Sequence, residues 1–148
     1  MREVLRSFYL YLIMFVLLAL AGCETLPRSA DEPLPVGTDN TAVVALLEGA
    51  RQNTSSGRLQ AAAANLERAL RIEPRNPVLW HELARVRLSQ SEAGQAEQLA
   101  AKSNTFAANN NALRAANWRL IAQARAQSGN QAGAEAAFSK AEELERQR

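Results

Sequence analysis

Apolar and small side chains recur with helical spacing between residues 41 and 146, and two tryptophans set the register of this pattern. Offsets +3, +4, +16, +20 and +23 from each tryptophan carry apolar or small side chains in both copies. They are Leu83, Ala84, Ala96, Ala100 and Ser103 after Trp80, and Ile121, Ala122, Ala134, Phe138 and Ala141 after Trp118. Leu46 stands 34 positions before Trp80, and Ala50, Ala62, Leu66 and Ala69 follow it at matching offsets. The chain therefore contains three copies of one helix-turn-helix pattern.

Six helices are expected from the repeat, at residues 41–54, 58–73, 77–89, 92–107, 112–127 and 131–146. Gly57, Gly94 and Gly129 lie at or near the turns within each pair, and Pro74 separates the first two units. The units span about residues 43–76, 77–110 and 115–148. Because Trp118 follows Trp80 by 38 positions rather than 34, we expect four inserted residues, with a turn at residues 109–111. The polar end of the last helix is expected to cap the stack.

Composition supports an all-α fold and argues against an enzyme. The chain is rich in Ala, Leu, Arg, Gln and Glu, and after residue 24 its aromatic residues are Trp80, Phe106, Trp118 and Phe138. It has one His, one Cys and no Gly-rich phosphate loop, so we assign no catalytic residue, metal, cofactor or small-molecule substrate. The net charge is only +2, which gives no reason to expect a nucleic-acid partner.

The amino terminus has the pattern of a bacterial lipoprotein signal peptide. Arg2 and Arg6 precede an apolar run at positions 8–21, which is short for a membrane span but suits a signal-peptide core. The run ends in Leu20-Ala21-Gly22-Cys23, which resembles the lipobox, with Cys23 as the lipidated first residue of the mature chain. By the same resemblance, Glu24 rather than Asp at the next position favours the periplasmic face of the outer membrane.

Between Cys23 and the first helix the sequence has no apolar period. Residues 24–40 include Pro27, Pro33 and Pro35, and proline disfavours a helix. We therefore expect residues 23–40 to form a lipidated tether. Extended at about 3.1 Å per residue, it would reach about 50 Å.

The repeated part of the chain, residues 43–144, resembles the tetratricopeptide repeat (TPR). That repeat is a pair of helices, with bulky residues early in the first helix and small residues where the helices touch. The resemblance implies a short solenoid of three units, in which Trp80 and Trp118 pack in the core. Ala side chains at positions 50, 62, 84, 96, 122 and 134 would let the two helices of each unit approach closely.

The resemblance also implies a partner-binding groove, because the first helices of TPR units line a concave surface. The positions of this sequence that match its lining residues are Leu47, Arg51, His81, Arg85, Leu88, Arg119 and Gln123. None of them is acidic, and a guanidinium there would hold a carboxylate or a peptide carbonyl. The alternatives are that the arginines are solvated surface charges and that His81 is a partly exposed residue of the helix surface.

A lipobox, a Pro-rich tether and a small TPR domain together resemble the TPR lipoproteins of Gram-negative bacteria that activate bifunctional class A penicillin-binding proteins. The resemblance implies a non-enzymatic outer-membrane lipoprotein that binds such a synthase and stimulates peptidoglycan synthesis. An alternative is a TPR adaptor or a pilotin-like chaperone for secretin, pilus or outer-membrane protein assembly. The sequence favours a protein partner in every case.

Overall fold

The computed structural model describes Leu34, Pro35 and residues 37–147. The predicted signal peptide, Cys23 and most of the predicted tether lie outside these residues. The described part contains six helices and no strand. They are α2 (Thr41–Ser55), α3 (Leu59–Ile72), α4 (Pro77–Ser89), α5 (Ala93–Phe106), α6 (Asn111–Gln127) and α7 (Gln131–Arg146). The all-α repeat fold is confirmed, and every predicted helix end lies within one residue of the observed one.

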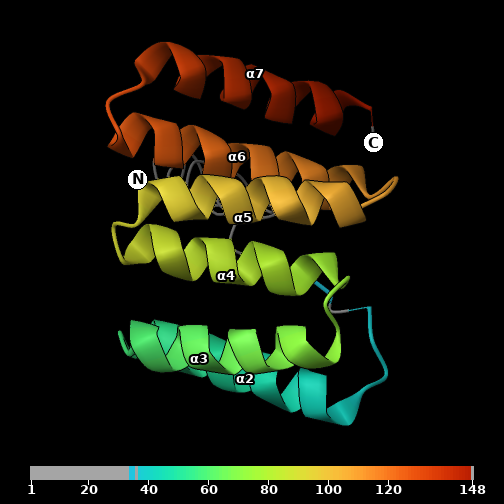
Figure 1. The fold of residues 1–148 in the computed structure, drawn as a ribbon. Coiled ribbons are helices and arrows are strands. Elements are labelled where there is room, and N and C mark those ends of the chain that lie inside the picture. Colours follow the sequence, from blue (N-terminus) through green and yellow to red (C-terminus); the bar gives the residue numbers. More distant parts are fainter. Residues whose placement is uncertain (1–33, 36, 148) are drawn as a thin grey trace, which may run out of the picture. The chain divides into compact units, whose positions relative to one another are not determined.

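The helices stack in chain order as three antiparallel pairs, from α2 and α3 at one end to α7 at the other (Figure 1). We call the first helix of each pair an A helix (α2, α4, α6) and the second a B helix (α3, α5, α7). The six alanines predicted at the contacts within pairs are all buried, with exposed fractions from 0% to 8%. Trp80 and Trp118 are partly buried against the core, as predicted. Small side chains thus let each pair close, and larger ones fill the space between pairs.

Asparagine begins all three A helices. The Asn40 side chain accepts hydrogen bonds from the main-chain N–H groups of α2, Asn76 does so for α4, and Asn110 does so for α6. These carboxamide oxygens bind N–H groups that have no partner inside the helix. Each A helix therefore begins at a position fixed by one local side chain.

The insertion between the second and third units is a helical turn rather than a longer loop. The connections α3–α4 and α5–α6 both have four residues, whereas α4 has 13 residues and α6 has 17. Both helices end nine residues after their tryptophan, so the four extra residues lengthen the start of α6. Asn111 is the first residue of that helix, and the third unit therefore begins there rather than at residue 115.

The segment before α2 lies against the helices, although it was predicted as part of the tether. The Leu34 side chain packs against the core cluster that contains Leu47 and Val78. The Leu34 carbonyl accepts a hydrogen bond from Arg51, and the Thr38 hydroxyl donates to Glu73. The folded unit therefore starts before the first helix.

Candidate functional site

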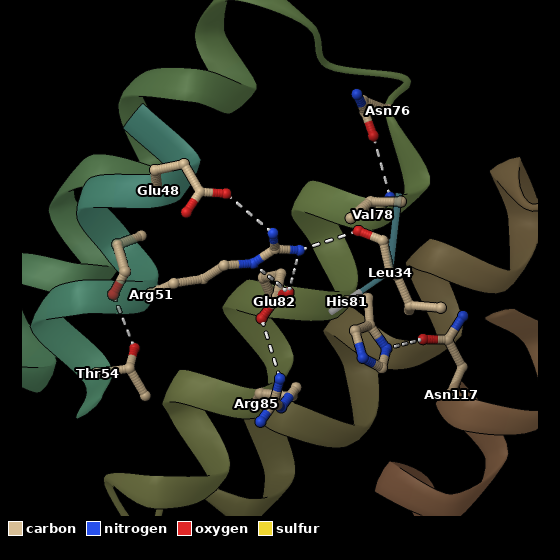
Figure 2. Close-up of polar contacts among 11 residues, drawn as sticks. Leu34, Glu48, Arg51, Thr54, Asn76, Val78, His81, Glu82, Arg85 and Asn117 are labelled. Atoms are coloured by element: carbon tan, nitrogen blue, oxygen red, sulfur yellow. Dashed lines mark hydrogen bonds and ion pairs between the residues drawn. The ribbon is translucent and has the colours of Figure 1, made fainter. Parts of the chain in front are cut away.

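Polar side chains of α2 and α4 meet around Arg51, one of the predicted groove residues. Its Nε and Nη2 atoms donate to Glu82 Oε1 at 3.1 and 3.0 Å, and Nη1 donates to Glu48 Oε1 at 3.1 Å. Nη2 also donates to the Leu34 carbonyl at 3.0 Å. Figure 2 shows these contacts together with Arg85, which approaches the other oxygen of Glu82 at 3.4 Å. We call Leu34, Glu48, Arg51, Glu82 and Arg85 the Arg51 cluster.

The Arg51 cluster differs from the prediction in containing buried acid. Glu82 follows His81 on α4, and only 8% of its side chain is exposed. It neutralises part of the charge that the predicted row of arginines would present. Arg51 was expected to hold a carboxylate or a peptide carbonyl of a partner, and in this structure both groups come from the chain itself. A shallow hollow of about 250 Å³ remains beside Arg51, Glu82 and Arg85.

Two of the predicted groove residues are not accessible. Leu47 is fully buried and His81 is 5% exposed, so the prediction that they line an open surface is wrong. Both occupy the same position of the repeat, one residue after Leu46 and Trp80. Leu47 belongs to the core cluster that Leu34 covers, and His81 faces α6. In the first two units, neighbouring elements pack over this position closely enough to exclude a partner.

His81 belongs to a buried polar network between the second and third units. Its Nδ1 lies 2.8 Å from the carboxamide oxygen of Asn117 (Figure 2). The Asn117 amide donates to Ser103 at 2.8 Å and to Asn104 at 3.0 Å, and the Ser103 hydroxyl donates to the Pro77 carbonyl. Because Asn117 Oδ1 can only accept, Nδ1 carries the proton of a neutral imidazole. Burial lowers the pKa of His81, against the opposing effects of Asn117 and Glu82.

The other predicted groove residues keep some exposure. Arg85 has 39% of its side chain exposed and Arg119 has 33%, and Arg119 pairs with Glu145 of α7. Leu88 is partly exposed and Gln123 is exposed. These residues, with the partly exposed Arg51, stay candidates for contact with a partner.

Sequence reasoning missed Glu82 and Asn117. Each is a polar residue at a repeat position where another unit carries leucine: Leu120 of unit three matches Glu82, and Leu79 of unit two matches Asn117. Asn117 is a polar residue directly before a core tryptophan, and this was the available signal for a buried hydrogen-bonded group. For Glu82 the signal was an acid next to His81 on a helix otherwise rich in arginine.

The described residues contain no group of His, Cys, Asp and Glu side chains that could hold a metal ion. None of the helices in this part of the chain is long and apolar enough to cross a membrane. The site is therefore a surface of charged, amide and aliphatic side chains on the A helices.

Comparison with known proteins identifies the repeat and the family. The tetratricopeptide-repeat family matches residues 54–116. The globular C-terminal domain of P. aeruginosa LpoP has a solved structure that is 48% identical in sequence, with a TM-score of 0.69. The match covers 71% of this chain and 99% of that chain. This chain belongs to the LpoP family. No curated protein matches its sequence significantly.

The family assignment agrees with the limits of the described fold. The match covers nearly all of a globular C-terminal domain, and the described helices of this chain run from Thr41 to Arg146. A TPR domain of this kind is a protein-interaction module. The predicted groove residues that stay accessible lie on the A helices, and we call them the A-helix face: Arg51, Arg85, Leu88, Arg119 and Gln123.

Proposed function

We propose that this chain is an outer-membrane lipoprotein, anchored through Cys23, that activates a bifunctional class A penicillin-binding protein. The observation that carries the proposal is the 48% identity to the LpoP domain over 99% of that domain. The Leu20-Ala21-Gly22-Cys23 sequence supports the lipid anchor. The chain would act by binding an active conformer of the synthase more tightly than an inactive one, so it needs no catalytic residue of its own.

The A-helix face is the surface that we propose for the synthase. Its accessible candidates are Arg51, Arg85, Leu88, Arg119 and Gln123, which come from all three units. Leu88 offers apolar area, and the arginines offer charged donors for carboxylates or main-chain carbonyls. Arg51 and Arg85 already contact Glu82, so a partner would meet a surface in which their geometry is fixed.

The test is a glycan-polymerisation assay with lipid II, a purified class A synthase and the full chain in detergent. The full chain should raise the polymerisation rate at saturation. The double variant Arg85→Glu/Arg119→Glu should bind the synthase at least tenfold more weakly while keeping its helical circular dichroism. Arg68→Glu/Arg71→Glu is the matched control, because it makes the same charge change at exposed positions of α3. Unchanged synthase rates with saturating wild-type chain would refute the activator assignment.

The lipid anchor is tested separately by palmitate labelling in a Gram-negative host. Wild-type chain should incorporate label and fractionate with the outer membrane, and Cys23→Ala should do neither. A Cys23→Ala chain that matures and stays in the outer membrane would refute the lipoprotein part of the proposal.

A further inference from the structure

The last helix carries an exposed aromatic side chain where the first two units are covered. Phe138 of α7 is 49% exposed. It borders a shallow hollow of about 410 Å³, whose other lining residues include Ala122, Ala126, Ala134 and Glu135. We call these five residues the terminal edge. Among the described helices, α7 lies at the end of the stack, with α6 beside it (Figure 1). The prediction that the last helix caps the stack with a polar face therefore fails around Phe138.

The repeat shows what covers the equivalent position elsewhere in the chain. Phe138 lies at offset +20 from its tryptophan, and the matching residues are Leu66 and Ala100, which are 1% and 0% exposed. Leu66 shares a core cluster with Leu79 and Leu83 of α4, and Ala100 shares one with residues of α6. In both units the next A helix buries this position. The third unit is the one whose next A helix is absent from the described residues.

The charges around the edge repeat as well. Glu97 and Glu135 both lie at offset +17 from their tryptophans. Glu97 pairs with Arg125 of the following A helix, with 2.7 Å between Arg125 Nη2 and Glu97 Oε1. Arg125 in turn lies seven residues after Trp118. Glu135 is exposed and forms no ion pair with another described residue. An A helix placed on the terminal edge would bring its own residue at that position to Glu135.

We infer that the terminal edge is a second docking surface, which binds an amphipathic helix of a partner protein in the position of a fourth A helix. The occupant presents bulky aliphatic side chains to Phe138 and an Arg or Lys to Glu135. The terminal edge contains no residue of the Arg51 cluster, although Gln123, a candidate contact for the synthase, also lines its hollow. The inference does not depend on the identity of the synthase. The observation that selects a helix, rather than an extended peptide, is that a helix covers the same surface in both preceding units.

The chain itself supplies a suitable probe, because α4 is the A helix that packs on a bulky residue at this position. A peptide that copies residues 76–90 carries Leu79 and Leu83 for Phe138 and Arg87, seven residues after Trp80, for Glu135. Labelled with fluorescein, this peptide is titrated with the full chain in detergent and followed by fluorescence anisotropy. We expect saturable binding with a Kd below about 1 mM.

Variants locate the binding on the terminal edge. Phe138→Glu should weaken peptide binding at least tenfold, and Ala126→Glu, at another exposed position of the edge, should do the same if the first variant folds poorly. Val44→Glu is the matched control, because Val44 is an exposed apolar residue on α2, outside the edge, and its variant should bind normally. Glu135→Arg should also weaken binding, and a peptide with Arg87→Glu should recover it.

Three outcomes would overturn the inference. The first is no saturable binding of the peptide to wild-type chain. The second is binding that Phe138→Glu and Ala126→Glu both leave unchanged, which would place the peptide elsewhere. The third is a wild-type dimer in sedimentation that Phe138→Glu converts to a monomer, which would make a second copy of the chain the occupant. Because the probe is not the synthase, these outcomes are independent of the polymerisation assay.

Discussion

Glu82 is the side chain on which the polar contacts between α2 and α4 converge. It accepts from Arg51 and pairs with Arg85, and it is almost fully buried. Glu48 also contacts Arg51, but 63% of its side chain is exposed. The two carboxylates therefore share one guanidinium in different surroundings. When a buried carboxylate loses its charge, the neighbouring arginines keep a positive charge that nothing compensates. When an exposed carboxylate loses its charge, water solvates the arginine in its place.

This contrast predicts unequal effects of two like substitutions. Glu82→Gln should lower the free energy of unfolding by about 1–3 kcal/mol, because Arg51 and Arg85 lose their buried carboxylate. Glu48→Gln should change it by less than about 0.5 kcal/mol. Urea denaturation of both variants measures the difference. Equal losses would mean that burial does not decide the strength of these pairs.

His81 gives the stability of the protein a dependence on pH. Burial lowers its folded-state pKa, so the unfolded chain binds a proton at a higher pH than the folded one. Stability is therefore complete above about pH 6.5, the ordinary value for histidine, and falls as the pH drops below it. In His81→Gln, whose amide can still donate to Asn117, the fall between pH 6.5 and 5 should be smaller. Thermal melting over this range measures it, and identical slopes for both proteins would count against the assignment.

For single residues, the sequence identified candidate groove residues but not the side chains that pack against them. The repeat position predicted the same face for Arg51, Leu47 and His81, and the structure leaves Arg51 partly exposed but buries the other two. Whether such a side chain is open depends on how closely the next element packs. For His81 that is set by Asn117 of α6, and for Leu47 by the core cluster against which Leu34 packs. His81 and Asn117 are 36 positions apart in the sequence, and Leu47 and Leu34 are 13 positions apart. The spacing of residues within one helix therefore could not predict these contacts.

The turns within the three helix pairs use one backbone conformation. Gly57, Ser91 and Gly129 lie at the same repeat position, at offset +11 from Leu46, Trp80 and Trp118, and have φ angles of 72°, 64° and 82°. This left-handed region is open to glycine and disfavours other residues. Gly94, which was predicted at or near the second turn, lies in the first turn of α5, and the left-handed residue of that turn is Ser91. Ser91 therefore carries the strained position of the second unit.

Exchanging these residues should move stability in opposite directions. Ser91→Gly should raise the free energy of unfolding by about 0.5–1 kcal/mol, because glycine adopts the turn without strain. Gly129→Ser should lower it by about 1 kcal/mol. A Cβ at Gly129 would meet no atom within 4 Å, so the loss would be conformational rather than steric. Denaturant unfolding of the two variants provides the comparison, and a destabilised Ser91→Gly would contradict the argument.

The extent of each helix was predictable because it depends on local signals. The spacing of Ala and Leu, Pro74 before α4, Pro77 at its first position and the turn residues all lie within about 15 positions of the helix ends that they determine. The local signal for the start of α6 was less direct, although its predicted start at residue 112 is within one residue of the observed one. Three consecutive asparagines suggest a loop, but Asn110 is a helix cap and Asn111 is already helical. Asparagine is common both in turns and at helix caps, and here Asn110 Oδ1 accepts a hydrogen bond from the N–H of Leu113, whose side chain is fully buried.

For the whole molecule, the contacts of Leu34 shorten the segment between the proposed lipid anchor at Cys23 and the domain. Leu34 packs on the core and Thr38 contacts Glu73, so the folded part begins about seven residues earlier than the first helix. The residues between Cys23 and Leu34 are 24–33, which cannot span more than about 36 Å even when fully extended. The sequence overestimated this distance because a Pro-rich segment without periodicity gives no sign of the surface that its end will contact.

The length of this segment should therefore limit activity in cells but not in solution. Deleting residues 25–31 leaves three residues before Leu34, with a span of about 11 Å at most. If the anchored chain must reach a synthase in the inner membrane, this variant should support less wall synthesis in cells. In the detergent assay it should stimulate the synthase as wild type does, because the deleted residues precede every contact of the described fold.

Replacing residues 25–31 with seven Gly and Ser residues keeps the length and should restore cellular activity. Full cellular activity of the deletion variant, at normal protein level and outer-membrane location, would show that reach is not limiting. Loss of activity in both variants would instead indicate that the sequence of the segment, and not its length, is recognised.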